Sequence, residues 1–259
     1  MKHLKQLKYF ILVLTLLLAV GCSSSDDNTN TENPNQNCKI SKITYGFGSG
    51  AETFDVSYNN SNISQFLSST TKVIFTYNSN QLTTKETINL SNNQTEFKSE
   101  FITTNGKITE ERTYEYFSGA INYTGKDTFE YSGNNLTLIQ HFDSNNAYSG
   151  KTVINWTNNN PTSTSFYDEN NVLECTITLN HDNTQVNKFN AEFTLFLFQD
   201  IFDEDFSQYL FLGNNNLTST VNSCSGNTTN YNITNNSNGY TSEIKQGTNS
   251  LYKFEYTCQ

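Results

Sequence analysis

One spacing recurs along most of this chain and constrains its fold more than any other feature. A large residue, usually aromatic, is followed five positions later by an aliphatic residue or proline, with turn-forming residues between them. In a β-hairpin with a two-residue loop, residues i and i+5 face each other and pack as a cross-strand pair. The instances are Tyr58 with Ile63, Tyr77 with Leu82, Tyr131 with Leu136, Trp156 with Pro161, Tyr167 with Val172, and Leu212 with Leu217.

The two central residues of each spacing are rich in asparagine and glycine. These residues tolerate the positive φ angles that tight hairpin turns require. The asparagine excess of the chain is therefore explained by turns. The expected loop pairs are Asn60-Ser61, Ser79-Asn80, Gly133-Asn134, Asn158-Asn159, Glu169-Asn170 and Asn214-Asn215.

The segments between the turns alternate as half-buried strands do. Val73, Phe75 and Tyr77 share one face, which predicts that Tyr77 is buried, and Lys85 is expected on the surface. The pattern contains about eighteen candidate strands, with boundaries uncertain by a few residues. The sequence thus predicts one all-β domain over residues 38–259, a long antiparallel meander of repeated hairpins curled into a barrel-like or half-open sheet.

The N-terminus predicts export and lipid attachment. A basic stretch precedes an uncharged run that is too short to span a bilayer, which is typical of a signal peptide over residues 1–21. The following Leu18-Ala19-Val20-Gly21-Cys22 resembles a bacterial lipobox, although Ala19 occupies the usual leucine position. The resemblance implies that Cys22 carries acyl chains, which would be the membrane contact of the mature protein.

The residues after Cys22 suggest an address and a tether. Ser23, Ser24, Ser25, Asp26 and Asp27 resemble the short acidic signal that sends lipoproteins of Bacteroidota to the outer face of the outer membrane. Residues 22–37 as a whole contain nothing to bury. They are therefore expected to form a flexible tether with a reach of roughly 20 Å.

Four cysteines besides Cys22 predict two disulfides, because an even number in an oxidising compartment normally pairs. Three pairings are open. Successive strands of a meander run in opposite directions, so each cysteine near a strand end lies at one of two ends of the sheet. With an even number of strands, Cys38 and Cys258 lie at one end, and Cys175 and Cys224 lie at the other. The hypothesis is therefore that Cys38 pairs with Cys258 and Cys175 with Cys224. The second pair would lie three strands apart, and would need the segment 193–205 to displace a strand.

Composition and missing motifs limit the function. The formal charge of −10 disfavours nucleic acid as a partner. No catalytic motif, cofactor fingerprint or metal-ligand spacing occurs, so no catalytic residue, cofactor or metal is assigned. His141 and His181 are interpreted as structural. The neighbours Glu110 and Glu111 would point to opposite faces of a strand, and so could not converge on one substrate.

Two groups of side chains leave an alternative open. Trp156, Tyr148 and Tyr167 could stack on sugar rings if exposed, although their places in the hairpin pattern favour core packing. The acidic cluster within 193–205 could hold calcium, but it lacks the spacing of an EF-hand loop and is better interpreted as a solvated loop. Its acids are Asp200, Asp203, Glu204 and Asp205.

A family resemblance rests on two of the turns. Tyr167-Asp168-Glu169-Asn170-Asn171-Val172 and Tyr77-Asn78-Ser79-Asn80-Gln81-Leu82 resemble degenerate YD-type repeats. A similar series occurs in Bacteroidota surface lipoproteins of a domain-of-unknown-function type, described as having a porin-like β-fold. The resemblance implies this fold and a cell-surface address, but no activity.

Three functions remain in order of preference. The first is a non-catalytic cell-surface lipoprotein, structural or interaction-mediating. The second is a module that binds a glycan or nutrient, and the third is a hydrolase. A glycan or a surface protein is the candidate partner, in addition to the membrane.

Overall fold

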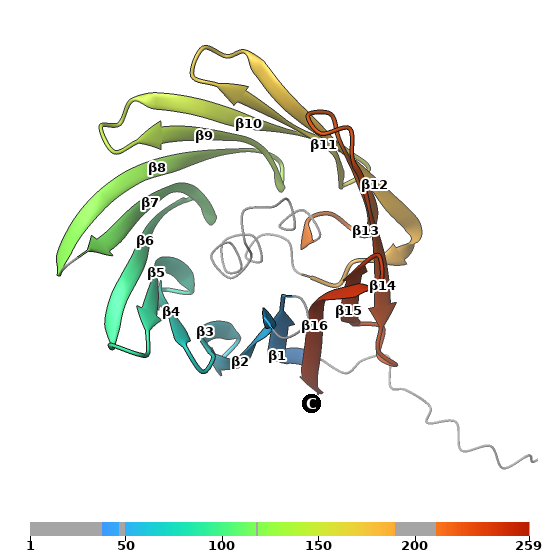
Figure 1. Cartoon of the computed structure of the whole chain (residues 1–259), viewed down its shortest axis with the longest axis horizontal. Coiled ribbons are helices and arrows are strands. Elements are labelled where there is room, and N and C mark those ends of the chain that lie inside the picture. The colour runs from blue at the N-terminus through green and yellow to red at the C-terminus, as the bar shows by residue number, and fades with distance from the viewer. Residues whose placement is uncertain (1–37, 47–49, 118, 190–210, 259) are drawn as a thin grey trace, which may run out of the picture. The chain divides into compact units, whose positions relative to one another are not determined.

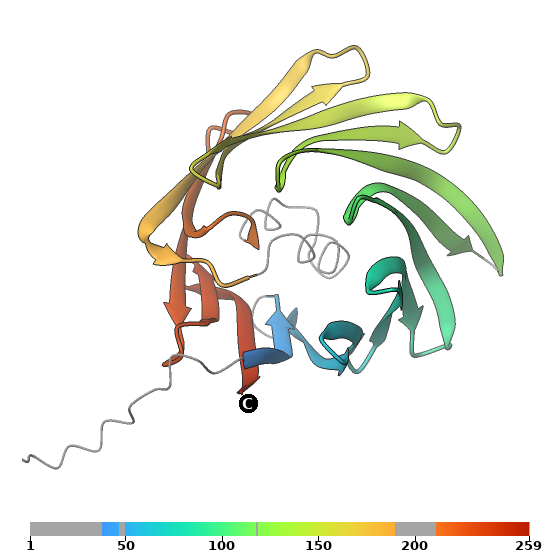
Figure 2. The same cartoon turned by 180° about the vertical axis from the view of Figure 1, so that it is seen from behind.

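The computed structural model describes residues 38–46, 50–117, 119–189 and 211–258. Across these residues, sixteen strands pair antiparallel in chain order, and β1 pairs with β16 to close a barrel. Figure 1 shows the strands arranged as a ring, and Figure 2 shows the same ring from behind. The all-β meander predicted from the sequence is confirmed, and the sheet is closed rather than half-open. No helix among the described residues is long and apolar enough to cross a membrane.

The strands are β1 Cys38–Tyr45, β2 Glu52–Asn59, β3 Asn62–Leu67, β4 Thr71–Asn78, β5 Gln81–Asn89, β6 Gln94–Thr104, β7 Lys107–Phe117, β8 Ala120–Ser132, β9 Asn135–Asp143, β10 Tyr148–Thr157, β11 Asn160–Asp168, β12 Leu173–Val186, β13 Asn215–Asn222, β14 Thr228–Asn235, β15 Thr241–Gln246 and β16 Asn249–Cys258. The described chain thus has fewer strands than the expected eighteen. One reason is that bulges let strands continue where the alternation of the sequence is interrupted. The longest, β12, has 14 residues and passes through register shifts next to His181.

Four of the six predicted cross-strand pairs are confirmed. Tyr58 faces Ile63, Tyr77 faces Leu82, Tyr131 faces Leu136, and Trp156 faces Pro161. The turn residues adopt positive φ as expected, for example 50° at Ser79 and 64° at Asn80. A fifth hairpin of this geometry joins β6 to β7 through Asn105-Gly106, and it lacks an aromatic residue at its first position.

The other two predicted pairs are wrong. Tyr167 faces Leu173 rather than Val172, because the turn closes from Asp168 to Val172 and holds one extra residue, Asn171, at a φ of 61°. Leu212 and Leu217 do not form a hairpin. Leu212 precedes β13, and Leu217 lies inside β13 opposite His181 of β12.

A β-bulge follows each of these tight turns. In four of the five hairpins a threonine occupies the bulge, and its hydroxyl donates to the carbonyl of the residue seven positions earlier. The bonds are Thr83 to Thr76 at 3.0 Å, Thr109 to Ile102 at 3.3 Å, Thr137 to Glu130 at 3.2 Å, and Thr162 to Asn155 at 3.2 Å. Each bulge shifts the alternation of its strand by one residue, so the faces beyond it are reversed.

The buried face of the sheet is its inner face, because the barrel is closed. Apolar side chains from β1 to β16 form one core on the inner face, and Ile43, Phe66 and Tyr252 are fully buried in it. Aromatic rings meet there in edge and stacked contacts, such as Phe66 with Phe75 at 5.0 Å between centroids.

The two ends of the barrel differ in their connections. One end, called here the termini end, holds Cys38 and Cys258 together with the tight turns at 60–61, 79–80, 105–106, 133–134 and 158–159. The turn at 236–240 also lies at this end, where Asn238 contacts both cysteines. The other end holds turns such as those at 144–147, 169–172 and 223–227. Consecutive antiparallel strands place every connection at one of these two ends.

Candidate functional site

Both disulfides of the parity hypothesis are present. Cys38 is joined to Cys258 across the β1–β16 closure, with 4.0 Å between their Cα atoms. Cys175 of β12 is joined to Cys224 in the turn after β13, with 5.4 Å between Cα atoms. The expected separation of three strands is wrong, because β12 and β13 are neighbours. The second bond therefore needs no displaced strand.

Several predicted residues lie outside the described part of the chain. They are the signal peptide 1–21, the lipidation residue Cys22, the residues Ser23, Ser24, Ser25, Asp26 and Asp27, the tether 22–37, and the acids Asp200, Asp203, Glu204 and Asp205. Among the residues that are described, no group of histidine, cysteine, aspartate and glutamate side chains could hold a metal ion.

An ion pair lies inside the barrel where the sequence predicted a surface lysine. Lys85 of β5 is 1% exposed, and its ammonium group lies 3.7 Å from the carboxylate of Glu111 on β7. The prediction was wrong because the bulge at Thr83 brings Leu82 and Lys85 to the same face. The pair reaches across β6, where the ring of Phe101 lies 5.8 Å from the ammonium group.

Further polar side chains continue this row on the inner face. Asp127 of β8 is the register partner of both Glu111 and His141. The Nδ1 atom of His141 lies 2.9 Å from Asp127 Oδ1, and its Nε2 atom lies 3.0 Å from Thr152 Oγ1. The carboxylate of Asp127, the imidazole of His141 and the hydroxyl of Thr152 are thus connected in the same order as the residues of a nucleophilic triad. The hydroxyl-bearing Thr152, however, is only 4% exposed.

The outer face of β6 to β8 carries a belt of paired charges. Glu110 accepts hydrogen bonds from Arg112 at 2.7 Å and from Lys126 at 3.1 Å. Burial raises the pKa of Glu110, but these two bonds outweigh it and hold the pKa below its usual value. On β6, Lys98 donates to Glu100 at 2.9 Å. Glu110 and Glu111 therefore point to opposite faces, as predicted.

Two tyrosines of the predicted hairpin pairs are half-buried at the termini end, and Tyr77 packs against the core. Burial raises the pKa of Tyr58 to about 12, although a backbone hydrogen bond at Ile40 lowers it in part. Burial alone raises the pKa of Tyr77 to about 12. The predicted burial of Tyr77 is thus confirmed in part, since the ring is half-buried.

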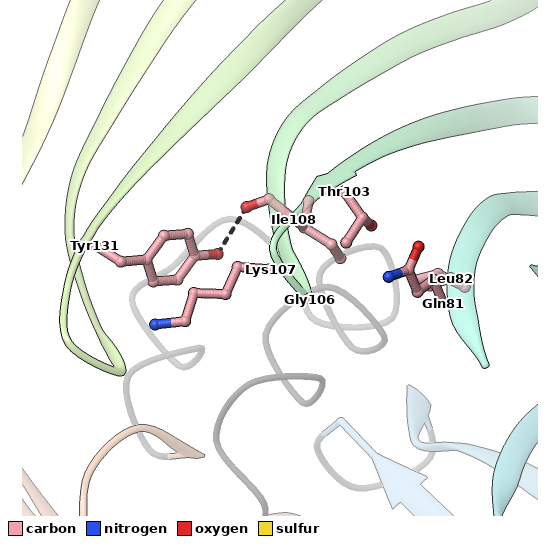
Figure 3. A pocket seen from close by; sticks show the side chains of 7 residues that line it. All are labelled: Gln81, Leu82, Thr103, Gly106, Lys107, Ile108 and Tyr131. Atoms are coloured by element: carbon pink, nitrogen blue, oxygen red, sulfur yellow. Dashed lines mark hydrogen bonds between the residues drawn. The ribbon is translucent and has the colours of Figure 1, made fainter. Parts of the chain in front are cut away.

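A narrow pocket lies between the turns that follow β4, β6 and β8 (Figure 3). The Tyr131 hydroxyl donates to the Ile108 carbonyl at 2.9 Å, and the Lys107 ammonium lies 5.1 Å from the centre of the Tyr131 ring. The pocket volume is about 20 Å³. This is room for about one water molecule, so the pocket is too small for a ligand.

A much larger cavity opens at the termini end beside Trp156. Its volume is about 670 Å³, within the range of small-molecule sites. One wall is the β8–β9 turn, a second is the β10–β11 turn, and a third is the chain that leaves β12 and enters β13. The lining residues are Ser132, Gly133, Asn134, Asn135, Trp156, Asn159, Asn187, Phe189, Gly213 and Asn214.

Asparagine contacts fix two of these walls to each other. Asn160 Nδ2 donates to Asn215 Oδ1 at 2.8 Å, and the Asn215 backbone donates back to Asn160 Oδ1 at 2.9 Å. The Asn214 N–H donates to the Asn159 carbonyl at 3.1 Å. His181 Nε2 lies 2.7 Å from the Pro161 carbonyl of the same β11 strand. His181 therefore has a structural environment, as predicted.

Of the aromatic residues that the sequence suggested for sugar stacking, Trp156 lies apart from the other two, while Tyr148 and Tyr167 share the neighbourhood of Lys151, which donates to Asn171 at 2.8 Å. Trp156 lines the large cavity, and its indole N–H donates to the Leu136 carbonyl at 2.7 Å. Tyr148 donates to Asn171 at 3.3 Å, and the Tyr167 ring lies 4.9 Å from the Lys151 ammonium. The expected core packing holds for Trp156 only in part, because this residue is half-buried at the cavity wall. The expectation is wrong for Tyr148 and Tyr167, which are not part of the core.

Sequence reasoning missed this cavity. Its asparagines were interpreted as turn formers only, and the turns that bring them together lie far apart in the chain. A signal was available in the density of asparagine around 132–135, 158–160 and 213–216, but nothing in the sequence places these three segments side by side.

Comparison with known proteins gives a fold but no family. No protein-family model matches this chain, and no curated protein matches it in sequence. A porin-like protein from Bacteroides vulgatus is similar in structure, with a TM-score of 0.56 and 14% identity over 84% of this chain and 98% of that one. A porin-like protein from Bacteroides uniformis gives a TM-score of 0.52 and 15% identity over 85% and 96%. The resemblance to porin-like proteins is thus confirmed at the level of the fold.

Proposed function

We propose that this chain is a non-catalytic lipoprotein of the outer membrane, anchored by acyl chains on Cys22 and exposed at the cell surface. In this role the barrel mediates contacts with a glycan or a surface protein. The degenerate YD-like repeats group it with surface lipoproteins that share the porin-like β-fold. The fold likeness to proteins of Bacteroides is consistent with an address in the cell envelope.

The observation that carries the proposal is the charged outer face of β6 to β8. A barrel embedded in lipid needs a continuous apolar band on its outer face, and charged side chains there are destabilising. Here Glu110 is paired with Arg112 and Lys126 on that face. Such a surface suits water, so attachment through an acyl anchor accounts better for a membrane address than insertion of the strands.

The anchor is tested by the Cys22→Ser variant in the producing cells. We expect loss of incorporated labelled fatty acid and an uncleaved precursor, because the acylated cysteine becomes the mature N-terminus. Thr29→Ala, in the tether, is the matched control and should be processed normally. Mature Cys22→Ser protein of unchanged mobility in the membrane fraction would contradict the anchor.

Surface exposure is tested separately. Replacing Asp26 and Asp27 with alanine should leave lipidation intact and reduce cleavage of the protein by protease added to whole cells. If protease access does not change, these acids do not act as an export signal.

A hydrolase is the alternative that the Asp127–His141–Thr152 order favours. Against it, Thr152 is buried, and its register partners on the flanking strands are Ile139 and Phe166. A substrate carbonyl would have to displace these side chains to reach the hydroxyl. We expect no labelling of the mature protein by a fluorophosphonate probe. Labelling that disappears in Thr152→Val would overturn the non-catalytic assignment.

A further inference from the structure

We infer that the cavity beside Trp156 is a binding site for a neutral carbohydrate. This inference deepens the proposed interaction role and rests on it. The cavity is formed by the β8–β9 turn, the β10–β11 turn and the segments that flank the β12–β13 connection. Four features of its lining determine the class of ligand.

The first feature is a buried donor without a partner. Asn187 is 7% exposed, and its Nδ2 atom has no hydrogen-bond partner among the described residues. Its Oδ1 atom accepts from the Phe189 N–H at 3.0 Å, which fixes the orientation of the amide. Leaving a buried donor unsatisfied costs about 1–3 kcal/mol. Asn187 is part of the cavity lining, but its Nδ2 atom has almost no accessible surface. A ligand oxygen would bond to this atom only by displacing the atoms that cover it, and would then remove the penalty.

The second feature is the chemical type of the lining. Asparagine amides both donate and accept, as sugar hydroxyls do, so the two kinds of group can pair in several ways. Asn134 and Asn214 supply such amides from two different walls, and both residues are exposed. A cluster of amides at one opening therefore suits a polyhydroxylated ligand.

The third feature is an aromatic side to the cavity. The indole of Trp156 is held by its hydrogen bond to the Leu136 carbonyl. Phe189 packs edge-on against Phe211, with 4.8 Å between ring centroids. Fixed rings of this kind can cover the apolar C–H face of a pyranose while the amides bind its hydroxyls.

The fourth feature is the absence of charge from the lining. The chain as a whole has 25 acidic and 15 basic residues, yet no charged side chain is among the described residues that line the cavity. The Lys107 ammonium lies at the rim, but it already donates to Asn134 Oδ1 at 3.3 Å and to the Gly133 carbonyl. The net charge of the protein would repel an acidic sugar. The neutral lining thus selects a neutral carbohydrate.

The walls are also fixed before a ligand binds. Gly213 has a φ of 90°, and a Cβ atom at this position would lie 2.7 Å from Pro161 Cδ. This close approach keeps Asn214 beside the β10–β11 turn, where the paired amides of Asn160 and Asn215 hold it. A preformed site loses less conformational entropy when a ligand binds.

Tryptophan fluorescence provides a direct test, because Trp156 is the only tryptophan in the chain. The full-length lipoprotein in detergent is titrated with maltohexaose, cellohexaose and chitohexaose, and with an oligogalacturonate of equal length. We expect a saturable change in the Trp156 emission with at least one neutral oligosaccharide, and none with the acidic one.

Two variants locate the response. Asn134→Ala/Asn214→Ala should weaken binding about tenfold, as expected for the loss of two hydrogen bonds. Asn145→Ala, an exposed turn asparagine at the opposite end, should bind like the wild type. Circular dichroism and thermal unfolding confirm that the variants are folded.

The inference is overturned if no neutral oligosaccharide changes the emission, if oligogalacturonate binds equally well, or if the double variant binds unchanged. None of these outcomes affects the acyl anchor or its processing, which are measured in cells. Failure of this site and failure of the proposed surface role are therefore distinguishable.

Discussion

The ammonium group of Lys85 lies 3.7 Å from the carboxylate of Glu111, and both side chains are almost completely buried inside the barrel. Removing one member of a buried ion pair typically costs about 3–5 kcal/mol, because the other charge stays in the interior. We expect Lys85→Met to lower the free energy of unfolding by this amount, as measured by urea denaturation.

A double variant separates charge from packing in this pair. Replacing both buried charges with apolar residues of similar size is often neutral. Lys85→Met/Glu111→Leu should therefore recover most of the stability that Lys85→Met loses. Lys253→Met, at an exposed lysine, should change the unfolding free energy by less than about 1 kcal/mol. If Lys85→Met behaves like Lys253→Met, the buried placement of Lys85 is wrong.

The bulge threonines are expected to stabilise their hairpins through their hydroxyl groups. Thr137→Val keeps the shape of the side chain but removes the bond to the Glu130 carbonyl. The expected loss is about 0.5–1.5 kcal/mol in the unfolding free energy. Thr95→Val in β6 is the control, since no side-chain hydrogen bond of Thr95 occurs among the described residues. Equal stabilities of the two variants would show that the bulge hydroxyl contributes nothing.

Alkaline pH should destabilise the barrel through its buried tyrosines. Folding raises the pKa of Tyr58 and Tyr77 from the usual 10.0 of tyrosine to about 12, because burial disfavours the phenolate. The stability that they contribute is complete below pH 10 and is lost as the pH rises toward 12. We expect Tyr77→Phe to lose less unfolding free energy than the wild type between these pH values. A parallel decline in both proteins would contradict the assigned burial.

The two disulfides should differ in what they contribute. The Cys38–Cys258 bond spans 220 residues and the Cys175–Cys224 bond spans 49. In the chain-entropy description the longer loop stabilises by about 1 kcal/mol more. Urea unfolding of Cys38→Ala/Cys258→Ala and of Cys175→Ala/Cys224→Ala measures the difference. Non-reducing peptide mapping checks the pairing itself, and a peptide joining Cys224 to Cys258 would refute it.

Much of this fold follows from local patterns in the sequence. Tyr77 and Leu82 lie five residues apart around Ser79-Asn80, and a two-residue turn makes them face each other whatever the rest of the chain does. The same local rule predicts Tyr58, Tyr131 and Trp156 with their partners. It fails at Tyr167, because an Asp168-initiated turn that includes Asn171 is one residue longer.

The direction of each strand is also fixed by the chain order. In a meander each strand reverses the last, so Cys38 and Cys258 meet at one end if the number of strands is even. The parity argument gave the correct pairs even though it counted about eighteen strands instead of sixteen, because both numbers are even.

Only the tertiary structure decided what the inner face contains. The bulge at Thr83 reverses the alternation, and the lysine that looked solvent-exposed becomes the buried partner of Glu111. A bulge depends on how two strands fit together around the whole barrel, so a pattern of single residues does not reveal it.

The cavity beside Trp156 was likewise decided by the tertiary structure. Asn134, Asn159 and Asn187 are each explained locally as residues of turns and strand ends. They share one opening because strand reversal places these connections at the same end, and the chain that enters β13 lies against the β10–β11 turn, where Asn214 donates to Asn159. The sequence by itself therefore determined the hairpins and their order, while long-range strand pairing decided which side chains meet.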